Sequence, residues 1–107
     1  MHPARCPPAS AAVDLLQLPN VGPAMAADFH LLGYHSPQSL RQADPYMLYQ
    51  ALCQQTGVRH DPCVLDVFIA VAHYLQQDEA LPWWHFTAQR KAALAARAVG
   101  SAWPLVQ

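Results

Sequence analysis

Hydrophobic side chains recur at helical spacing through the middle of the chain. The clearest stripe covers three turns, with a residue every three or four positions: Val64, Phe68, Ala72 and Leu75. Shorter stripes with the same spacing precede it: Met25, Phe29 and Leu32, then Leu48 and Leu52. Residues three and four positions apart share one face of an α-helix. The pattern predicts an all-α domain in which the helix that begins at Pro62 is central.

Prolines and glycines mark where these helices begin and end. Proline suits the first helical position because its missing N–H has no partner there, and glycine suits the turn that ends a helix. Four prolines follow a residue that favours a helix start: Gly22-Pro23, Ser36-Pro37, Asp44-Pro45 and Asp61-Pro62. Three glycines lie where helices are expected to end: Gly33, Gly57 and Gly100. The marks predict helices over Ala11–Gln17, Pro23–Leu32, Pro37–Gln42, Pro45–Thr56, Pro62–Gln76 and Thr87–Val99.

The order of these elements predicts one small domain flanked by two segments. We expect a flexible N-terminal arm in residues 1–12, a domain of about five core helices in residues 13–86, and a C-terminal helix and tail in residues 87–107. The helices on either side of Gly57 repeat the plan of the first pair, which gives the hypothesis of two hairpins related by a pseudo-two-fold axis. The charged residues Arg90, Lys91 and Arg97 predict a mostly solvated last helix.

Composition excludes several classes of protein. Hydrophobic residues make up 53% of the chain and charged residues 12%, whereas disordered chains are poor in the former and rich in the latter. No uncharged apolar run reaches the length of a membrane span, and the first residues lack the pattern of a signal peptide. Three cysteines at irregular spacing do not form a disulfide framework. We therefore expect a cytoplasmic protein with no membrane partner.

The most informative motif is a predicted hairpin of two helices joined by the turn Pro19-Asn20-Val21-Gly22. Asn20 tolerates the left-handed conformation that such a turn requires. The small side chain of Ala26 lets the two helices pack closely. The backbone N–H groups of Asn20, Gly22 and Ala24 then lie at a helix N-terminus, where unpaired donors and the helix dipole favour an anion.

This turn and its flanking helices resemble the helix-hairpin-helix motif. Two later segments, Asp61-Pro62-Cys63-Val64-Leu65-Asp66 and Pro82-Trp83-Trp84, extend a resemblance over Leu15–Trp84 to the small bacterial proteins of the pathogenicity-locus, or mitomycin-resistance-like, family. The resemblance implies contact with the DNA backbone, without reading of the base sequence, through Asn20, Val21, Gly22, Pro23 and Ala24. It also implies a monovalent cation on the backbone carbonyls of Leu16, Leu18 and Val21. The family name describes a genetic context and implies no reaction.

Charge limits how strongly such a turn can bind DNA. The net charge is −1 with six Lys and Arg residues, and only Arg41 and Arg59 are basic between Asp14 and Gln89. Neutralising two phosphates corresponds to a log–log salt slope of about −1.8, so we expect weak binding. The other interpretation is a protein-interaction domain that binds a protein partner or a second copy of itself. No cofactor is expected.

An alternative hypothesis, based on Cys63, is that the protein is a thiol-dependent enzyme or a redox protein. This cysteine lies in the first turn of a predicted helix, where the helix dipole lowers a thiol pKa, and His60 is three residues away as a base. The nearby carboxylates of Asp61 and Asp66 are expected to raise this pKa instead. Asp66 is also expected to stabilise the N-terminus of its own helix. The other interpretation is a small cysteine that packs the start of the helix.

Zinc is a weaker alternative for the same cysteine. Structural zinc needs four ligands, usually in pairs at short spacing. Cys53, His60 and Cys63 offer one short pair, so no metal is expected.

Four aromatic residues form a predicted cluster after the central helix. They are Tyr74, Trp83, Trp84 and Phe86. The cluster is interpreted as a cap over the end of the core or as a partner-binding patch, since aromatic residues anchor interfaces.

Overall fold

The computed structural model describes residues 1–97 of the chain. All regular structure in these residues is helical, which confirms the predicted all-α class. The four α-helices are α1 (Pro23–Leu31), α2 (Pro45–Thr56), α3 (Pro62–Gln77) and α4 (Thr87–Arg97). The 3-10 helices are Pro3–Arg5, Ala9–Ala11, Leu15–Gln17, Gln38–Leu40 and Trp83–Phe86. No helix of the described part is both long enough and apolar enough to cross a membrane.

The predicted helix starts at Pro23, Pro45 and Pro62 are confirmed. The carboxylates of two of the preceding residues accept a hydrogen bond from the first turn, from Tyr46 N to Asp44 and from Cys63 N to Asp61, each at 2.8 Å. Such bonds pair N–H groups that have no partner inside the helix. The predicted stop glycines are confirmed by their left-handed backbone, with φ of 91° at Gly33 and 68° at Gly57, while Gly100 lies outside the described residues.

The predicted helix over Ala11–Gln17 is wrong. One 3-10 helix ends at Ala11, and a separate one begins after Asp14, which forms a capping box with Gln17. Asp14 accepts from Leu16 N at 2.8 Å, while the Gln17 side-chain oxygen accepts from Asp14 N at 3.1 Å. This box starts a new turn inside the predicted helix, and Pro19 ends it two residues later. The predicted helix over Pro37–Gln42 is likewise shortened to the 3-10 helix Gln38–Leu40.

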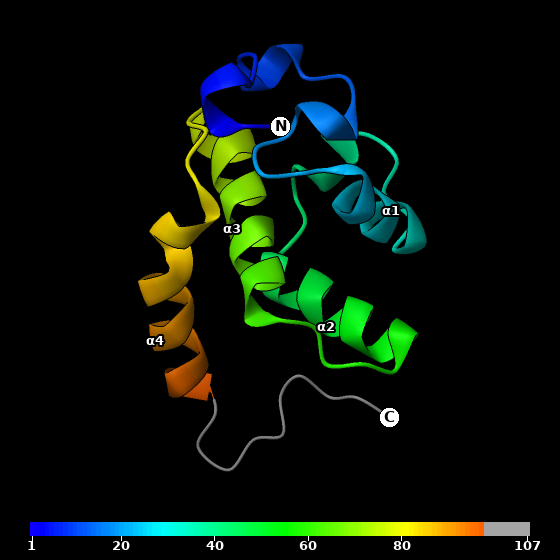
Figure 1. Cartoon of the computed structure of the whole chain (residues 1–107), viewed down its shortest axis with the longest axis vertical. Coiled ribbons are helices and arrows are strands. Elements are labelled where there is room, and N and C mark those ends of the chain that lie inside the picture. Colours follow the sequence, from blue (N-terminus) through cyan, green and yellow to red (C-terminus); the bar gives the residue numbers. More distant parts are fainter. Residues whose placement is uncertain (98–107) are drawn as a thin grey trace.

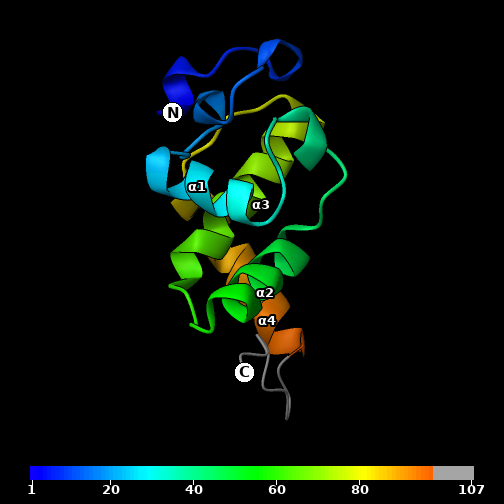
Figure 2. The same cartoon turned by 90° about the vertical axis from the view of Figure 1, so that its right-hand side faces the viewer.

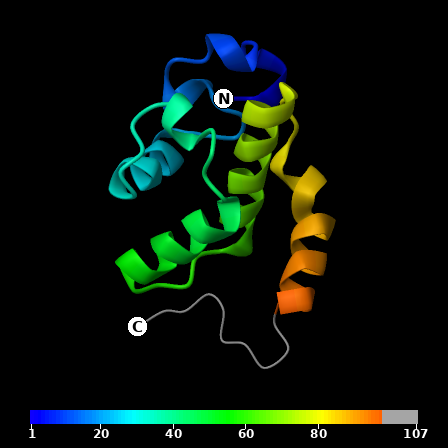
Figure 3. The same ribbon diagram turned by 180° about the vertical axis from the view of Figure 1, so that it is seen from behind.

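Helix α3 is the centre of the fold, as predicted. Helices α1 and α2 lie on one side of it and α4 lies on the other (Figures 1 and 3). Figure 2 views the molecule from the first side, with α1 above α2. Phe29 of α1 packs on Phe68 of α3 with ring centroids 5.2 Å apart. Because neighbours cover both sides, α3 is buried without interruption from Leu65 to Val71, more than a single stripe predicts.

A buried ion pair joins α4 to α3. Asp66 is fully buried, and its Oδ1 accepts from Arg90 Nε at 2.9 Å while its Oδ2 accepts from Thr87 Oγ1 at 2.8 Å. The expectation that Asp66 serves the N-terminus of its own helix is therefore wrong. The charge of Arg90 is also not solvated, because its side chain is 11% exposed, whereas the neighbouring Lys91 is exposed as predicted.

Residues 1–12, expected to form a flexible arm, fold back over the end of α3 in the structure (Figure 1). Tyr74 donates its hydroxyl to the Pro7 carbonyl at 2.5 Å, and Ala9 N donates to Asp78 Oδ1 at 2.7 Å. Ala12 is fully buried in the core. Asn20 N also donates to the Met1 carbonyl at 2.8 Å, which places the chain start beside the predicted hairpin turn.

Candidate functional site

The predicted turn before α1 adopts the conformation that its residues favour. Asn20 has a left-handed backbone with φ of 66°, and its side-chain amide donates to the Leu81 carbonyl at 2.9 Å. Val21 is buried at 2% exposure and anchors the turn in the core. Gly22 is the N-cap of α1, which begins at Pro23. The turn is thus held from both sides, by the core and by the connector after α3.

Two of the three predicted anion-binding donors are available. Asn20 N donates to the Met1 carbonyl at 2.8 Å, so this N–H is occupied. The N–H groups of Gly22 and Ala24 have no acceptor among the residues that the structure describes, as expected in the first turn of a helix. A Cβ at Gly22 would meet no atom within 4 Å, so this end of α1 is open.

The carbonyls predicted to hold a monovalent cation are contacted by the N-terminal nitrogen of the chain. The Met1 ammonium donates to Val21 O at 2.6 Å and to Leu18 O at 2.8 Å. Partial burial lowers the pKa of this ammonium, and Cys6 opposes the effect. A positive group therefore lies on two of the three predicted carbonyls, and binding of a free cation stays a prediction.

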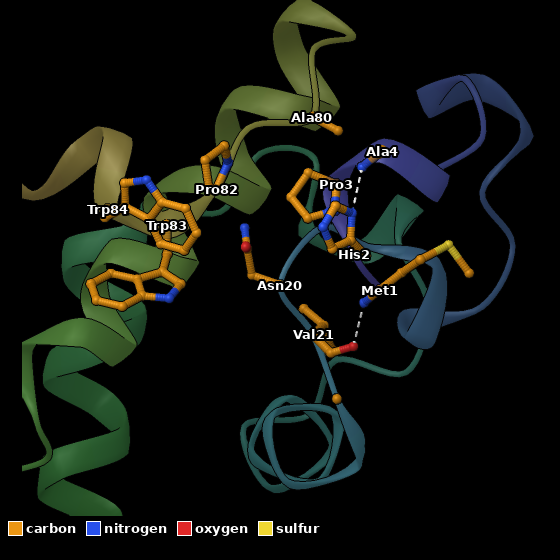
Figure 4. Close-up of a pocket in the computed structure, with 11 residues that line it drawn as sticks. Met1, His2, Pro3, Ala4, Asn20, Val21, Ala80, Pro82, Trp83 and Trp84 are labelled. Carbon is orange, nitrogen blue, oxygen red and sulfur yellow. Dashed lines mark hydrogen bonds between the residues drawn. The ribbon is translucent and has the colours of Figure 1, made fainter.

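A pocket of about 820 Å³ lies next to the turn. Three segments line it: the chain start with Met1, His2, Pro3 and Ala4, the turn with Asn20, Val21 and Gly22, and the connector with Ala80, Pro82, Trp83 and Trp84. Figure 4 shows the tryptophans on one side and the first residues on the other, with Asn20 and Val21 between them. The volume falls within the range typical of small-ligand sites.

The predicted aromatic cluster divides into a buried and an exposed part. Tyr74 and Phe86 belong to the core, at 1% and 4% exposure. Trp83 is half-buried against the core, whereas Trp84 is 63% exposed. The two tryptophan rings meet edge to face, with centroids 5.6 Å apart and planes at 83°. The core therefore fixes Trp83, and Trp84 keeps ring surface available at the pocket.

The described lining of the pocket carries neither acidic side chains nor Lys or Arg. Polar groups of the lining residues include the Asn20 amide, the His2 ring, the backbone N–H of Gly22 and the Met1 nitrogen, which already donates to Val21 O. His2 Nδ1 accepts from Ala4 N at 3.1 Å, which holds the first turn of the chain at the rim. The site thus offers donors and apolar rings to a ligand.

The structure does not bring Cys63 and His60 into a common site. The Cys63 thiol is hydrogen-bonded to Asp61, and this bond together with partial burial raises the pKa of the thiol. His60 instead lies 2.8 Å from Thr56 Oγ1 through Nε2, and its backbone N–H donates to Cys53 Sγ at 3.5 Å. The carboxylate therefore outweighs the helix dipole, and the surroundings of Cys63 do not favour a thiolate.

The three residues considered for zinc do not form a metal site. Cys53 is fully buried and Cys63 is half-buried at the start of α3. Within residues 1–97 no group of three or more His, Cys, Asp or Glu side chains is placed to hold a metal ion.

Sequence reasoning missed the residues that complete the pocket. The first four residues and Ala80 line it, although they are separated from the turn by many positions in the sequence. No local pattern marks them, because their place depends on the chain start folding back over α3. Pro82 and Trp83 belonged to a segment singled out for its aromatic content, but nothing linked it to the turn.

Comparison with known proteins places this chain in a family. The family described as Cdd1, pathogenicity locus, matches residues 8–92. A "Mitomycin resistance protein McrB" of Streptomyces lavendulae is 39% identical over 82 residues, which cover 77% of this chain and 78% of that protein. No solved structure matches the chain. The family resemblance of the sequence is confirmed, and the chain belongs to the Cdd1 pathogenicity-locus family.

Proposed function

We propose that this protein is a small binding module that contacts the backbone of nucleic acid through the turn Asn20–Ala24. The observation that carries the proposal is the open N-terminus of α1. Among residues 1–97, the N–H groups of Gly22 and Ala24 find no acceptor, and no carboxylate lines the pocket beside them. Such a helix end binds phosphate through its donors and its dipole. Contact of this kind does not depend on the base sequence, since phosphates are the same at every step.

We further propose that the turn belongs to a shortened helix-hairpin-helix motif. Its first arm is the 3-10 helix Leu15–Gln17 and its second arm is α1. The half-buried Ala26 lies on the inner part of α1, where a small side chain permits close packing. The hypothesis of two related hairpins pairs this turn with the one between α2 and α3. The two pairs share the order helix, short turn, helix, but α2 and α3 are longer than the arms of the first pair.

Weak binding follows from the charges around the turn. No Lys or Arg lines the pocket in the described part of the chain, and Arg90 is engaged by Asp66. Nucleic-acid affinity depends chiefly on the number of phosphates neutralised by basic groups. The protein therefore gains little from long-range attraction and depends on short-range donors.

Fluorescence anisotropy with labelled single-stranded, duplex and junction DNA tests this function, at about 20 mM and then about 150 mM salt. Binding should be detectable at low salt and fall as salt rises. Gly22→Glu should abolish it, because the new carboxylate lies at the phosphate site and its Cβ meets no atom that would disturb the fold.

Gln54→Glu is the matched control, since it makes the same charge change at an exposed position of α2. Its affinity should equal that of the wild type. If no DNA binds at low salt, or if both variants lose binding equally, the turn is not a phosphate site and the hairpin serves packing or contact with another protein.

A further inference from the structure

The pocket beside the turn has the features of a site for a planar ring. Trp84 presents a 63% exposed indole, and Trp83 behind it is half-buried against the core. Trp84 meets Trp83 edge to face with ring centroids 5.6 Å apart, and its exposed ring surface remains open to a second ring. Stacking on aromatic side chains is how proteins hold unpaired bases, and it tolerates any base because every base has a π face.

The same pocket reaches the predicted phosphate site. Gly22 lines the pocket and also carries one of the two unpaired N–H groups at the start of α1. Asn20 contributes its side-chain oxygen, because its amide nitrogen already donates to the Leu81 carbonyl at 2.9 Å. A ligand that lies here meets the two tryptophans on one side and the Asn20 side chain beside them (Figure 4). The N–H donor of Gly22 belongs to the same lining.

We infer that the pocket takes the base of one unpaired nucleotide in a single strand, stacked on Trp84, while the adjoining phosphate lies at Gly22 and Ala24. This inference rests on the proposed function, and it names single-stranded nucleic acid as the substrate class. A base inside a duplex is stacked on both faces and cannot enter the pocket unless it leaves the helix. The lining suits this occupant at short range, since it offers the Gly22 N–H to a phosphate and, among the described residues, no carboxylate that would repel one.

The test compares a labelled oligothymidylate of about ten nucleotides with a duplex of the same length and with free thymidine monophosphate. Binding is followed by anisotropy for the oligonucleotides and by tryptophan fluorescence for all three. The variants are Trp84→Ala, Trp84→Phe and Gly22→Glu. Met47→Ala is the control, because Met47 is an exposed apolar residue at 71% exposure that does not line the pocket.

The oligothymidylate should bind more tightly than the duplex and quench tryptophan fluorescence. Trp84→Ala should weaken oligothymidylate binding roughly 5- to 100-fold and leave duplex binding unchanged. Trp84→Phe should retain most of the affinity, because it keeps a ring, and Met47→Ala should behave as the wild type. Since Trp84 is largely exposed, its replacement should leave the circular dichroism spectrum unchanged.

Different results identify which idea fails. If Gly22→Glu weakens binding of both DNA forms but Trp84→Ala changes neither, the pocket inference is overturned and the proposed function stands. If free thymidine monophosphate binds as tightly as the oligonucleotide, the pocket is a mononucleotide site and the strand is not its ligand. Absence of binding to all three probes overturns both proposals.

Discussion

Arg90 on α4 donates from Nε to Oδ1 of Asp66 on α3 at 2.9 Å and from Nη2 to Oδ2 at 3.3 Å. Both oxygen atoms of the carboxylate are thereby hydrogen-bonded inside the core, and Thr87 Oγ1 is a further donor to Oδ2. The pair also raises the pKa of the Arg90 guanidinium, so that its charge persists at any accessible pH. This buried pair connects the last described helix to the centre of the fold.

Removal of this arginine should strongly destabilise the protein. Arg90→Met keeps most of the side-chain stem but leaves the fully buried Asp66 with an uncompensated charge. Breaking one partner of a buried pair costs about 3–5 kcal/mol, which is a large share of the stability of a small domain. Urea unfolding measures the change. Lys91→Met, at the exposed neighbouring position, should shift the midpoint little, and equal shifts in the two variants would refute the assigned role.

Replacing Gly33 and Gly22, the glycines on either side of α1, by alanine should lower the stability of the protein by different amounts. Gly33 has φ of 91°, which an L side chain adopts with strain, although a Cβ there would meet no atom within 4 Å. Gly33→Ala should therefore cost about 1–2 kcal/mol from backbone strain alone. Gly22 has φ of −105° and equally open surroundings, so Gly22→Ala should cost less. Denaturant unfolding of both variants compares them, and a larger loss at position 22 would contradict this reading of the turn.

The Cys63 thiol should react slowly with alkylating reagents near neutral pH. Its hydrogen bond to Asp61 raises the thiol pKa, so little thiolate is present. Asp61→Asn keeps a side chain that can cap α3 and removes the negative charge, so the alkylation rate of Cys63 should increase. Mass spectrometry after timed iodoacetamide treatment resolves the three cysteines. The fully buried Cys53 should stay protected in both proteins and serves as the internal reference. A Cys63 that reacts fast already in the wild type would revive the thiol hypothesis.

Tyr49 should titrate at a higher pH than an ordinary tyrosine. Its hydroxyl donates to the His60 carbonyl, and burial, followed by the neighbouring Cys53, raises the pKa of Tyr49 to about 12. The folded state therefore holds this proton more tightly than the unfolded chain does. The resulting stability is fully present below the unfolded pKa of about 10 and is lost as the pH rises through about 12.

Ultraviolet absorbance of the phenolate measures this titration. Tyr49→Phe should remove the transition near pH 12 and leave the transitions of the other tyrosines in place. If the highest transition persists in this variant, the raised pKa belongs to another tyrosine.

The starts and ends of α1, α2 and α3 could be predicted from the sequence because they depend on neighbouring residues. Proline fits the first turn, an aspartate before it pairs the free N–H groups, and glycine adopts the left-handed stop, all within a few positions. The same local chemistry explains the error before α1. The capping box of Asp14 and Gln17 is as local as the other caps, but the prediction over Ala11–Gln17 did not take it into account.

Family membership was also available from the sequence, because the motif around the turn and the Asp61–Asp66 segment are contiguous. The turn conformation followed as well, since Asn20 adopts the left-handed backbone that its side chain tolerates. In contrast, the pairing of Asp66 with Arg90 joins residues 24 positions apart. A carboxylate in the first turn of a helix has a local use at that helix end, and only the docking of α4 turned it into a buried partner.

The candidate site divides in the same way. The sequence by itself determined the turn and the free donors of Gly22 and Ala24, because backbone conformation and helix ends are set by nearby residues. The occupation of the third predicted donor, Asn20 N, by the Met1 carbonyl was decided by the tertiary structure alone. Only the tertiary structure decided that the chain start and the Trp83–Trp84 segment meet that turn and enclose a pocket. It also decided that the surroundings of Cys63 are governed by Asp61 rather than by the helix dipole. Such outcomes depend on which distant surfaces exclude water together, and on how burial and neighbouring charges balance at each group.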